Sequence, residues 1–211
     1  MRSALVFYGQ MREFDLCIKK WDTFVKRYTP DIFIHTWKPV DKVPYDPIAI
    51  TIEKQIDFSF EHPGVTKYST SAVNVFSQMY SIRESDMLRI KYERVNKFRY
   101  DYVIRSRFDI AFHNPGKINL KDIDPDKLNV CGNHWEHDPY KFDDNLMISK
   151  SDNMTRLSGQ LYQFNSDKTH MTKLIHSGEQ IMSEYIKTEW PNGFGDIYKN
   201  HMLDFTLARD L

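Results

Sequence analysis

Cysteine is scarce in this chain, with two residues among 211, Cys17 and Cys131. The two lie far apart and lack the close spacing of zinc ligands, which argues against a zinc site built on them. Disulfides belong to oxidising compartments, so a chain with so little cysteine is most simply interpreted as a reduced, intracellular protein. We expect both cysteines to serve as small core side chains.

Long apolar runs and an excess of charge of one sign are also missing. No segment approaches the ~18 apolar residues that a membrane-spanning helix requires, and the opening segment Met1–Tyr8 turns polar too soon for a signal peptide. Lysine plus arginine and aspartate plus glutamate both number 29, so no net field favours nucleic acid or an anionic membrane. These absences predict a cytoplasmic protein (the host cytoplasm if its source is viral), with no nucleic-acid partner and no membrane span.

The spacing of apolar residues predicts an α/β fold in a single domain, a size that 211 residues allow. Strand 3–8 is followed by helix 14–28, which Pro30 ends, and then by strand 31–37. A helix that crosses between two strands in this way predicts a parallel, right-handed βαβ unit. Further along we expect a strand at 48–52, a helix at 71–96, strands at 102–112, 128–131 and 146–148, helices at 151–164 and 178–188, and a strand or short helix around 201–208.

The stretch Tyr100–Phe112 carries the strongest chemical signal. Its apolar, β-branched start is typical of a buried strand, and Arg105, Arg107 and Asp109 follow at a spacing of two, which places them on one face of a strand. Guanidinium groups bind phosphate oxygens bidentately, and a carboxylate suits a divalent cation that bridges those oxygens. The alternative is an internal Arg–Asp ion pair at the end of the strand.

The first two predicted strands also end in polar groups. Gly9-Gln10-Met11-Arg12 follows the first, and Thr36 and Trp37 end the second, so these residues are expected at one edge of a parallel sheet, where nucleotides bind. Trp37 has the shape to stack on a base but is equally typical of a core. Gln78 and Tyr80, near the start of the long helix, could face the same ligand or lie on the surface.

The second half of the chain supplies candidate carboxylates. Asp143 and Asp144 follow the polar, aromatic segment 132–140 and precede a predicted strand, an arrangement that suits a general base or a sugar-hydroxyl site; a solvated turn is the alternative. Glu179 falls in the first turn of a predicted helix, where a carboxylate could act in catalysis or simply interact with the helix dipole.

Taken in order, these motifs resemble the GT-A type glycosyltransferases, and more narrowly the small glycosyltransferases of bacterial surface polysaccharides and large DNA viruses. Within that group the chain is similar to the N-terminal domain of a chlorella virus multi-domain glycosyltransferase. The resemblance rests on Gly9-Gln10-x-Arg12, Asp31-x-Phe33-x-His35-x-Trp37, Tyr100-Asp101-x-Val103-Ile104-Arg105-x-Arg107-x-Asp109, Asp143-Asp144-x-x-x-x-Ser149 and Glu179.

The resemblance implies a Rossmann-like GT-A α/β/α sandwich with a mixed, mainly parallel central sheet. It implies a nucleotide-binding half at about 1–112, an acceptor half at about 113–211, and further domains of a longer polypeptide. It also implies a nucleotide-diphosphate sugar donor and Mn²⁺ or Mg²⁺. In the family an Asp-x-Asp motif holds the metal; here Arg107 stands at its first position and only Asp109 remains, with His201 as a possible further ligand.

The predicted reaction transfers a sugar from the donor, a UDP-sugar by preference, to a hydroxyl of an oligosaccharide or glycoprotein acceptor. Asp144 or Glu179 would be the base if configuration is inverted, which we favour, and Asp143 would bind sugar hydroxyls. The metal on Asp109, helped by Arg105 and Arg107, would neutralise the diphosphate. The predicted cradle for the nucleotide is made of Gly9, Gln10, Arg12, Thr36, Trp37 and Gln78.

Two other functions remain open at this point. A nucleotidyltransferase also combines an α/β fold, a metal and a nucleotide, but it would normally carry a glycine-rich loop with a lysine after the first strand. A non-catalytic carbohydrate-binding module would instead use aromatic platforms, for which Trp135, Tyr140 and Trp190 are available. Binding of nucleoside diphosphates separates the transferase from the module.

Overall fold

The computed structural model describes residues 1–12, 14–38, 40, 42–58, 70–112, 118–131, 145–166, 195–200 and 205–207. The described chain is an α/β fold whose seven-stranded sheet has the order β3-β2-β1-β4-β7-β6-β8. The strands of this sheet are β1 (Ser3–Gly9), β2 (Asp31–Trp37), β3 (Ala49–Glu53), β4 (Tyr102–Arg107), β6 (Lys127–Cys131), β7 (Leu146–Ser149) and β8 (Gly195–Asn200). The helices are α1 (Phe14–Tyr28), α2 (Thr70–Asn96) and α3 (Ser151–Ser166), with a short 3₁₀ helix at Leu120–Asp122.

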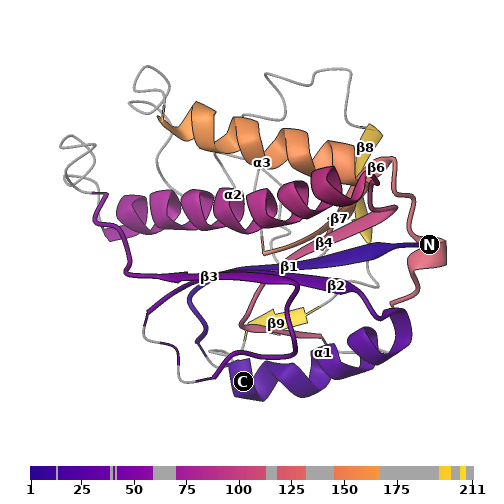
Figure 1. The fold of residues 1–211 in the computed structure, drawn as a ribbon, viewed down its shortest axis with the longest axis horizontal. Coiled ribbons are helices and arrows are strands. Elements are labelled where there is room, and N and C mark those ends of the chain that lie inside the picture. Colours follow the sequence, from indigo (N-terminus) through magenta and orange to yellow (C-terminus); the bar gives the residue numbers. More distant parts are fainter. Residues whose placement is uncertain are drawn as a thin grey trace.

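The sheet is mixed but mainly parallel, as the sequence predicts. Strands β3, β2, β1 and β4 run parallel to their neighbours, β6 and β8 pair in parallel, and only β7 lies antiparallel to the strands on either side of it among the described residues. Helices α2 and α3 cover one face of the sheet and α1 covers the other, so the molecule has three layers (Figure 1). This arrangement is Rossmann-like.

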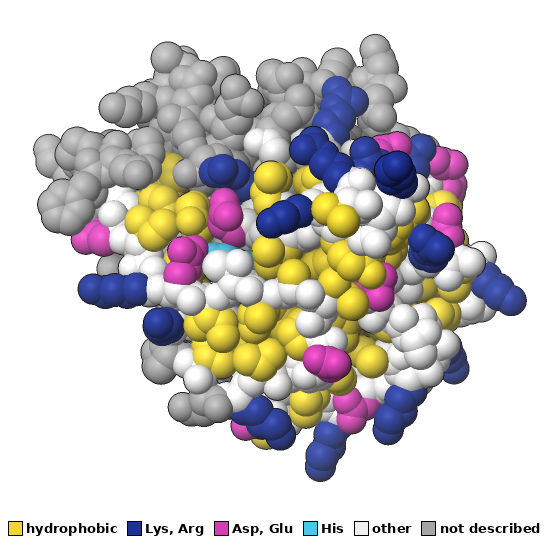
Figure 2. Space-filling model, in the orientation of Figure 1, with side chains coloured by type: hydrophobic (Ala, Val, Ile, Leu, Met, Phe, Trp, Pro, Cys, Tyr) yellow, Lys and Arg dark blue, Asp and Glu magenta, His cyan; other side chains and the backbone are white. Residues whose placement is uncertain are grey.

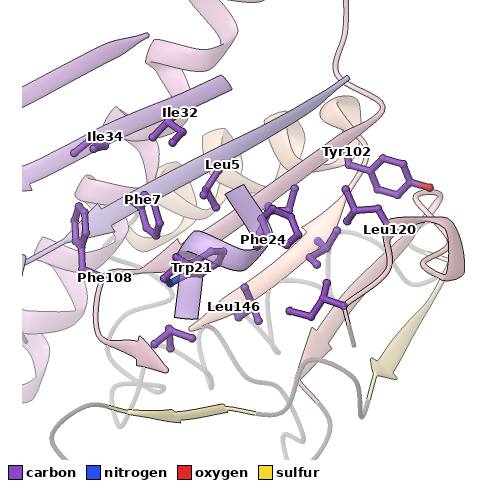
Figure 3. Close-up of a cluster of buried hydrophobic side chains, with 14 of the residues drawn as sticks. Leu5, Phe7, Trp21, Phe24, Ile32, Ile34, Tyr102, Phe108, Leu120 and Leu146 are labelled. Carbon is purple, nitrogen blue, oxygen red and sulfur yellow. The ribbon is translucent and has the colours of Figure 1, made fainter. Parts of the chain in front are cut away.

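Alternating side chains of β1 contribute to two separate cores. Ala4, Val6 and Tyr8 belong to the cluster under α2 and α3, whereas Leu5 and Phe7 belong to the cluster that packs against α1. Figure 3 shows the second cluster, with Phe7 between Trp21 of α1 and Phe108. A strand buried on both faces has to be apolar throughout, which explains the uninterrupted apolar run at the start of the chain.

Two predicted elements differ in the structure. The strand predicted at 102–112 is interrupted: β4 ends at Arg107, residues 108 and 109 form a turn, and β5 (Ile110–Phe112) pairs with β9 (Phe205–Leu207) in a separate two-stranded sheet. The turn lets Phe108 stack on Phe7, with ring centroids 5.2 Å apart. Strand β8 was not predicted, since the segment around Gly195 resembles a turn-rich loop. The helix predicted at 178–188 lies outside the described residues.

On the face that Figure 2 shows, the described residues include charged side chains of both signs. Basic side chains occur there at several separate places with acidic side chains among them, in keeping with 29 residues of each sign. None of the helices in the described part of the chain has both the length and the apolar content needed to cross a bilayer.

Candidate functional site

A pocket of about 320 Å³ opens beyond the ends of β1, β2 and β4, beside the first turns of α2. It is lined by Tyr8, Gly9, Gln10, Arg12, Trp37, Gln55, Asn74, Ser77, Gln78, Arg107 and Asp109. Pockets of a few hundred Å³ are of the size that holds small molecules and cofactors.

The topology of the sheet explains why the pocket forms there. From β1 the chain builds β2 and then β3 on one side, and then returns to place β4 on the other side of β1. The order in which the strands are added therefore reverses direction between β1 and β4. In parallel α/β sheets, ligands bind beyond the carboxyl ends of the strands at such a switch point. Here Tyr8 of β1 lies opposite Arg107 of β4, and both line the pocket.

The turn after β1 forms the base of the pocket. Gly9 has a φ of +93°, a backbone conformation that is open to glycine and costly for residues with a Cβ. Its N–H donates to Ser81 Oγ of α2 at 2.7 Å. The side chain of Gln10 donates to Gln55 Oε1 at 3.0 Å, and Gln55 in turn donates to Ser77 Oγ at 3.2 Å. This chain of amides ties the turn to the segment after β3 and to α2.

Arg107 and Asp109 form a two-bond ion pair at the β4 end of the pocket. Arg107 Nε donates to Asp109 Oδ1 at 2.9 Å and Nη2 donates to Oδ2 at 2.5 Å, while Nη1 donates to Asn145 Oδ1 at 3.0 Å. The arginine side chain is 30% exposed and the aspartate side chain 10%. The ion pair that the sequence offered as an alternative is therefore present, and both of its members line the pocket.

Arg105 does not line the pocket with Arg107. Its side chain points to the same face of β4 but lies one step deeper, where α3 covers it and it is 1% exposed. There Nη1 donates to Ser158 Oγ at 3.1 Å and Nη2 lies 2.6 Å from Met147 Sδ. Arg105 therefore contacts α3 and β7 in this structure, away from the predicted phosphate position.

The end of β2 is buried more deeply than a ligand-stacking role would require. Trp37 is 3% exposed and stacks on Tyr80 of α2 at 5.5 Å, so only part of its ring borders the pocket. Thr36 is fully buried and shares a face with Ile32 and Ile34, which pack toward α1, on the side of the sheet away from α2.

The structure brings together seven of the predicted nucleotide or metal residues in the lining of the pocket: Gly9, Gln10, Arg12, Trp37, Gln78, Arg107 and Asp109. Arg105 and Thr36 do not line the pocket. The predicted catalytic carboxylates Asp143, Asp144 and Glu179 and the predicted ligand His201 lie outside the described residues, as do Trp135, Tyr140 and Trp190.

Four of the lining residues are not among those predicted from the sequence: Tyr8, Gln55, Asn74 and Ser77. Of these four, Gln55 is the one that the sequence could have predicted, because it is polar and comes two residues after the end of β3 in a parallel sheet. Asn74 and Ser77 lie one and two turns from the start of α2, on the side of Gln78. Nothing in the local pattern of either residue distinguishes it from a surface position.

No protein-family model matches the chain, and no curated protein matches its sequence.

Proposed function

We propose that this chain is a glycosyltransferase of the GT-A type. It would take a nucleotide-diphosphate sugar, by preference a UDP-sugar, and move the sugar to a hydroxyl of a glycan or glycoprotein acceptor in the cytoplasm. The observation that carries the proposal is the pocket at the β1/β4 switch point, with a glycine turn at its base and arginines from both sides. The order of motifs along the sequence supports the same reaction class.

The lining of the pocket combines two kinds of group, charged and amide, which suits a ligand that carries both phosphates and hydroxyls. Arg12 and Arg107 with its partner Asp109 are the charged residues among the described lining residues. Arg12 is exposed, and no ion pair links it to another described residue. Its guanidinium group is therefore available to a diphosphate. The remaining polar lining is mostly amide, from Gln10, Gln55, Asn74 and Gln78, and amides donate to and accept from bases and sugar hydroxyls alike.

The reaction breaks the bond between the anomeric carbon and the diphosphate oxygen and forms a bond from that carbon to the acceptor oxygen. Positive groups beside the diphosphate stabilise the charge that develops on the leaving group, which is the role proposed for Arg12 and Arg107. The acceptor proton passes to a base, for which Asp144 or Glu179 is proposed, and Asp143 is proposed to bind sugar hydroxyls.

A divalent cation fits this site through Asp109. Magnesium-type ions bind through one or two carboxylates together with substrate phosphates and water, and Asp109 supplies one carboxylate at the end of the pocket where Arg107 lies. Both of its oxygens accept from Arg107, so the cation and the guanidinium group compete for them. The described residues contain no group of three or more His, Cys, Asp or Glu side chains that could hold a metal, and His201 is the proposed further ligand. When bound, Mn²⁺ or Mg²⁺ would supply positive charge to the leaving diphosphate.

The substitution Asp109→Asn is expected to distinguish the interaction of Asp109 with the cation from its ion pair with Arg107. The amide holds neither the cation nor the charged pair, so Mn²⁺ should no longer tighten UDP binding. Without metal the variant should bind UDP as tightly as the wild type, or up to roughly fivefold more tightly, because a negative charge beside the phosphates is gone. Calorimetric titrations in EDTA and in Mn²⁺ measure both. A variant that keeps the full Mn²⁺ effect contradicts the assignment of Asp109 as the metal ligand.

The reaction itself is tested by incubating the purified chain with UDP-, GDP- and TDP-sugars and measuring the nucleoside diphosphate released, with and without oligosaccharide acceptors. We expect release from one nucleotide class, accelerated by an acceptor. Release of pyrophosphate from a nucleoside triphosphate and a sugar phosphate would identify a nucleotidyltransferase instead. Glycan binding with no nucleotide dependence would identify a carbohydrate-binding module.

A further inference from the structure

A buried chain of hydrogen bonds runs from the base of the pocket to the edge of the sheet. The Gly9 N–H donates to Ser81 Oγ at 2.7 Å, Ser81 Oγ lies 2.6 Å from His35 Nδ1, and His35 Nε2 lies 2.8 Å from Glu53 Oε1. Ser81 and His35 are both fully buried, whereas the Glu53 side chain is 34% exposed. The chain joins β1, α2, β2 and β3, four elements that are distant in sequence.

The chemistry of the partners fixes the direction of these bonds. The Glu53 carboxylate has no donor, so His35 donates to it through Nε2–H. The neutral ring then presents Nδ1 as an acceptor, so the Ser81 hydroxyl donates to Nδ1 and the Ser81 oxygen accepts from the Gly9 N–H. Burial lowers the pKa of His35 in spite of the neighbouring Glu53 and Glu84, which keeps the ring in the neutral form that this arrangement requires.

A serine, a histidine and a carboxylate in sequence are also the components of a hydrolytic triad. Ser81 cannot act as a nucleophile here, because its side chain is fully buried and does not line the pocket. Its oxygen already accepts from the Gly9 backbone. The group therefore acts on the pocket through Gly9 and not on a substrate.

Gly9 is a residue whose conformation needs support. It is the last residue of β1, its φ is +93°, and the lining residues Gln10 and Arg12 follow it directly in the chain. The Ser81 bond is the contact that fixes the direction of its N–H from outside β1. Trp37 and Tyr80 enclose the His35 ring at centroid distances of 4.8 and 5.7 Å, so the ring has little room to turn.

We propose that Ser81 and His35 are positioning residues that hold the Gly9 turn in the conformation that receives the nucleoside diphosphate. The inference rests on the proposed function, since it assumes that this ligand binds in the pocket. It adds a role for two buried side chains that make no contact with the ligand. Loss of the hydrogen bonds that link Gly9, Ser81 and His35 should weaken the binding of the nucleoside diphosphate even in variants that still fold.

Ser85 provides a matched control on the same helix. It is as fully buried as Ser81, but its hydroxyl donates to the Ile82 carbonyl of its own helix. We expect Ser81→Ala to weaken UDP binding about tenfold, the equivalent of about 1.4 kcal/mol, and Ser85→Ala to leave it unchanged. Melting temperatures of both variants show whether the losses of stability are comparable, and calorimetric titration with UDP gives the affinities.

A second pair of variants keeps the test independent of Ser81. His35→Asn places an acceptor near the position of Nδ1 and gives up the contact with Glu53, whereas His35→Gln reaches Glu53 and gives up the acceptor for Ser81. We expect His35→Asn to retain more UDP affinity than His35→Gln. Equal affinities within this pair, or a Ser81→Ala variant that binds UDP as well as Ser85→Ala, would overturn the inference while the proposed function stands. A wild-type chain that binds no nucleoside diphosphate overturns the proposed function and, with it, this inference.

Discussion

Replacing Arg107 by alanine should weaken UDP binding by about 100-fold, or about 2.8 kcal/mol. The guanidinium group lines the pocket at the end where the diphosphate is proposed to bind, and Asp109 and Asn145 hold it in place from two directions. A charge-assisted hydrogen bond contributes about 1.5–3 kcal/mol. Removal of the Arg107 side chain also leaves the Asp109 carboxylate without this partner beside the phosphates. The repulsion between the carboxylate and the phosphates then adds to the lost attraction.

Two companion variants separate these contributions. Arg107→Lys keeps the charge but not the fork of donors, so it should recover part of the affinity. The double variant Arg107→Ala with Asp109→Asn removes the repulsion as well and should bind UDP more tightly in EDTA than Arg107→Ala alone. Calorimetry with UDP is the measurement, and thermal melting checks the fold. An Arg107→Ala affinity within twofold of the wild type would show that the β4 end of the pocket is not a phosphate site.

The largest expected effect on stability belongs to Arg89, which lies far from the pocket lining. Arg89→Ala should lower the free energy of unfolding by about 3–5 kcal/mol, the usual cost of removing one partner from a buried ion pair. Arg89 is fully buried and makes four bonds of 2.6–2.7 Å, to Asp86 and Glu93 of its own helix and to Ser151 and Thr155 of α3. Burial acts to lower the pKa of Arg89, and the two carboxylates outweigh it, so the guanidinium group stays charged.

Arg99 is the matched control for this prediction. It contacts the same Glu93 at 3.2 Å and Asp152 at 3.3 Å, but its side chain is 53% exposed. Exposed ion pairs contribute about 0–1 kcal/mol, so Arg99→Ala should cost less than about 1 kcal/mol. Urea unfolding of both variants compares the losses. Equal losses would mean that burial of the Arg89 network does not add to its contribution.

The first third of the fold follows from the sequence because its signals are local. Helix α1 and strand β2 have the bounds that were predicted, since Pro30 separates an apolar 3.6-residue period from an apolar run. Helix α2, predicted at 71–96, begins one residue earlier and ends at the predicted residue. The parallel pairing of β1 with β2 then follows from the crossing helix.

The site is less predictable because it depends on depth and on distant partners. A period of two gives the face of a strand but not the point where a helix covers it. Arg105 and Arg107 therefore look alike in sequence, although Ser158 of α3 contacts the buried Arg105 and Arg107 lines the pocket. The turn after β4 depends on the packing of Phe108 against Phe7, a contact across about a hundred residues. The burial of His35 is possible only because Ser81 and Glu53 satisfy its ring nitrogens from two other elements.

Every role proposed above depends on the binding of a nucleoside diphosphate in the pocket between β1 and β4. Calorimetric titration of the wild-type chain with UDP, GDP and TDP, each in EDTA and in Mn²⁺, tests it most directly. We predict saturable binding of one nucleotide, UDP by preference, at one site per chain, with Mn²⁺ increasing the affinity. A chain that binds none of the three nucleotides in either condition would contradict the account.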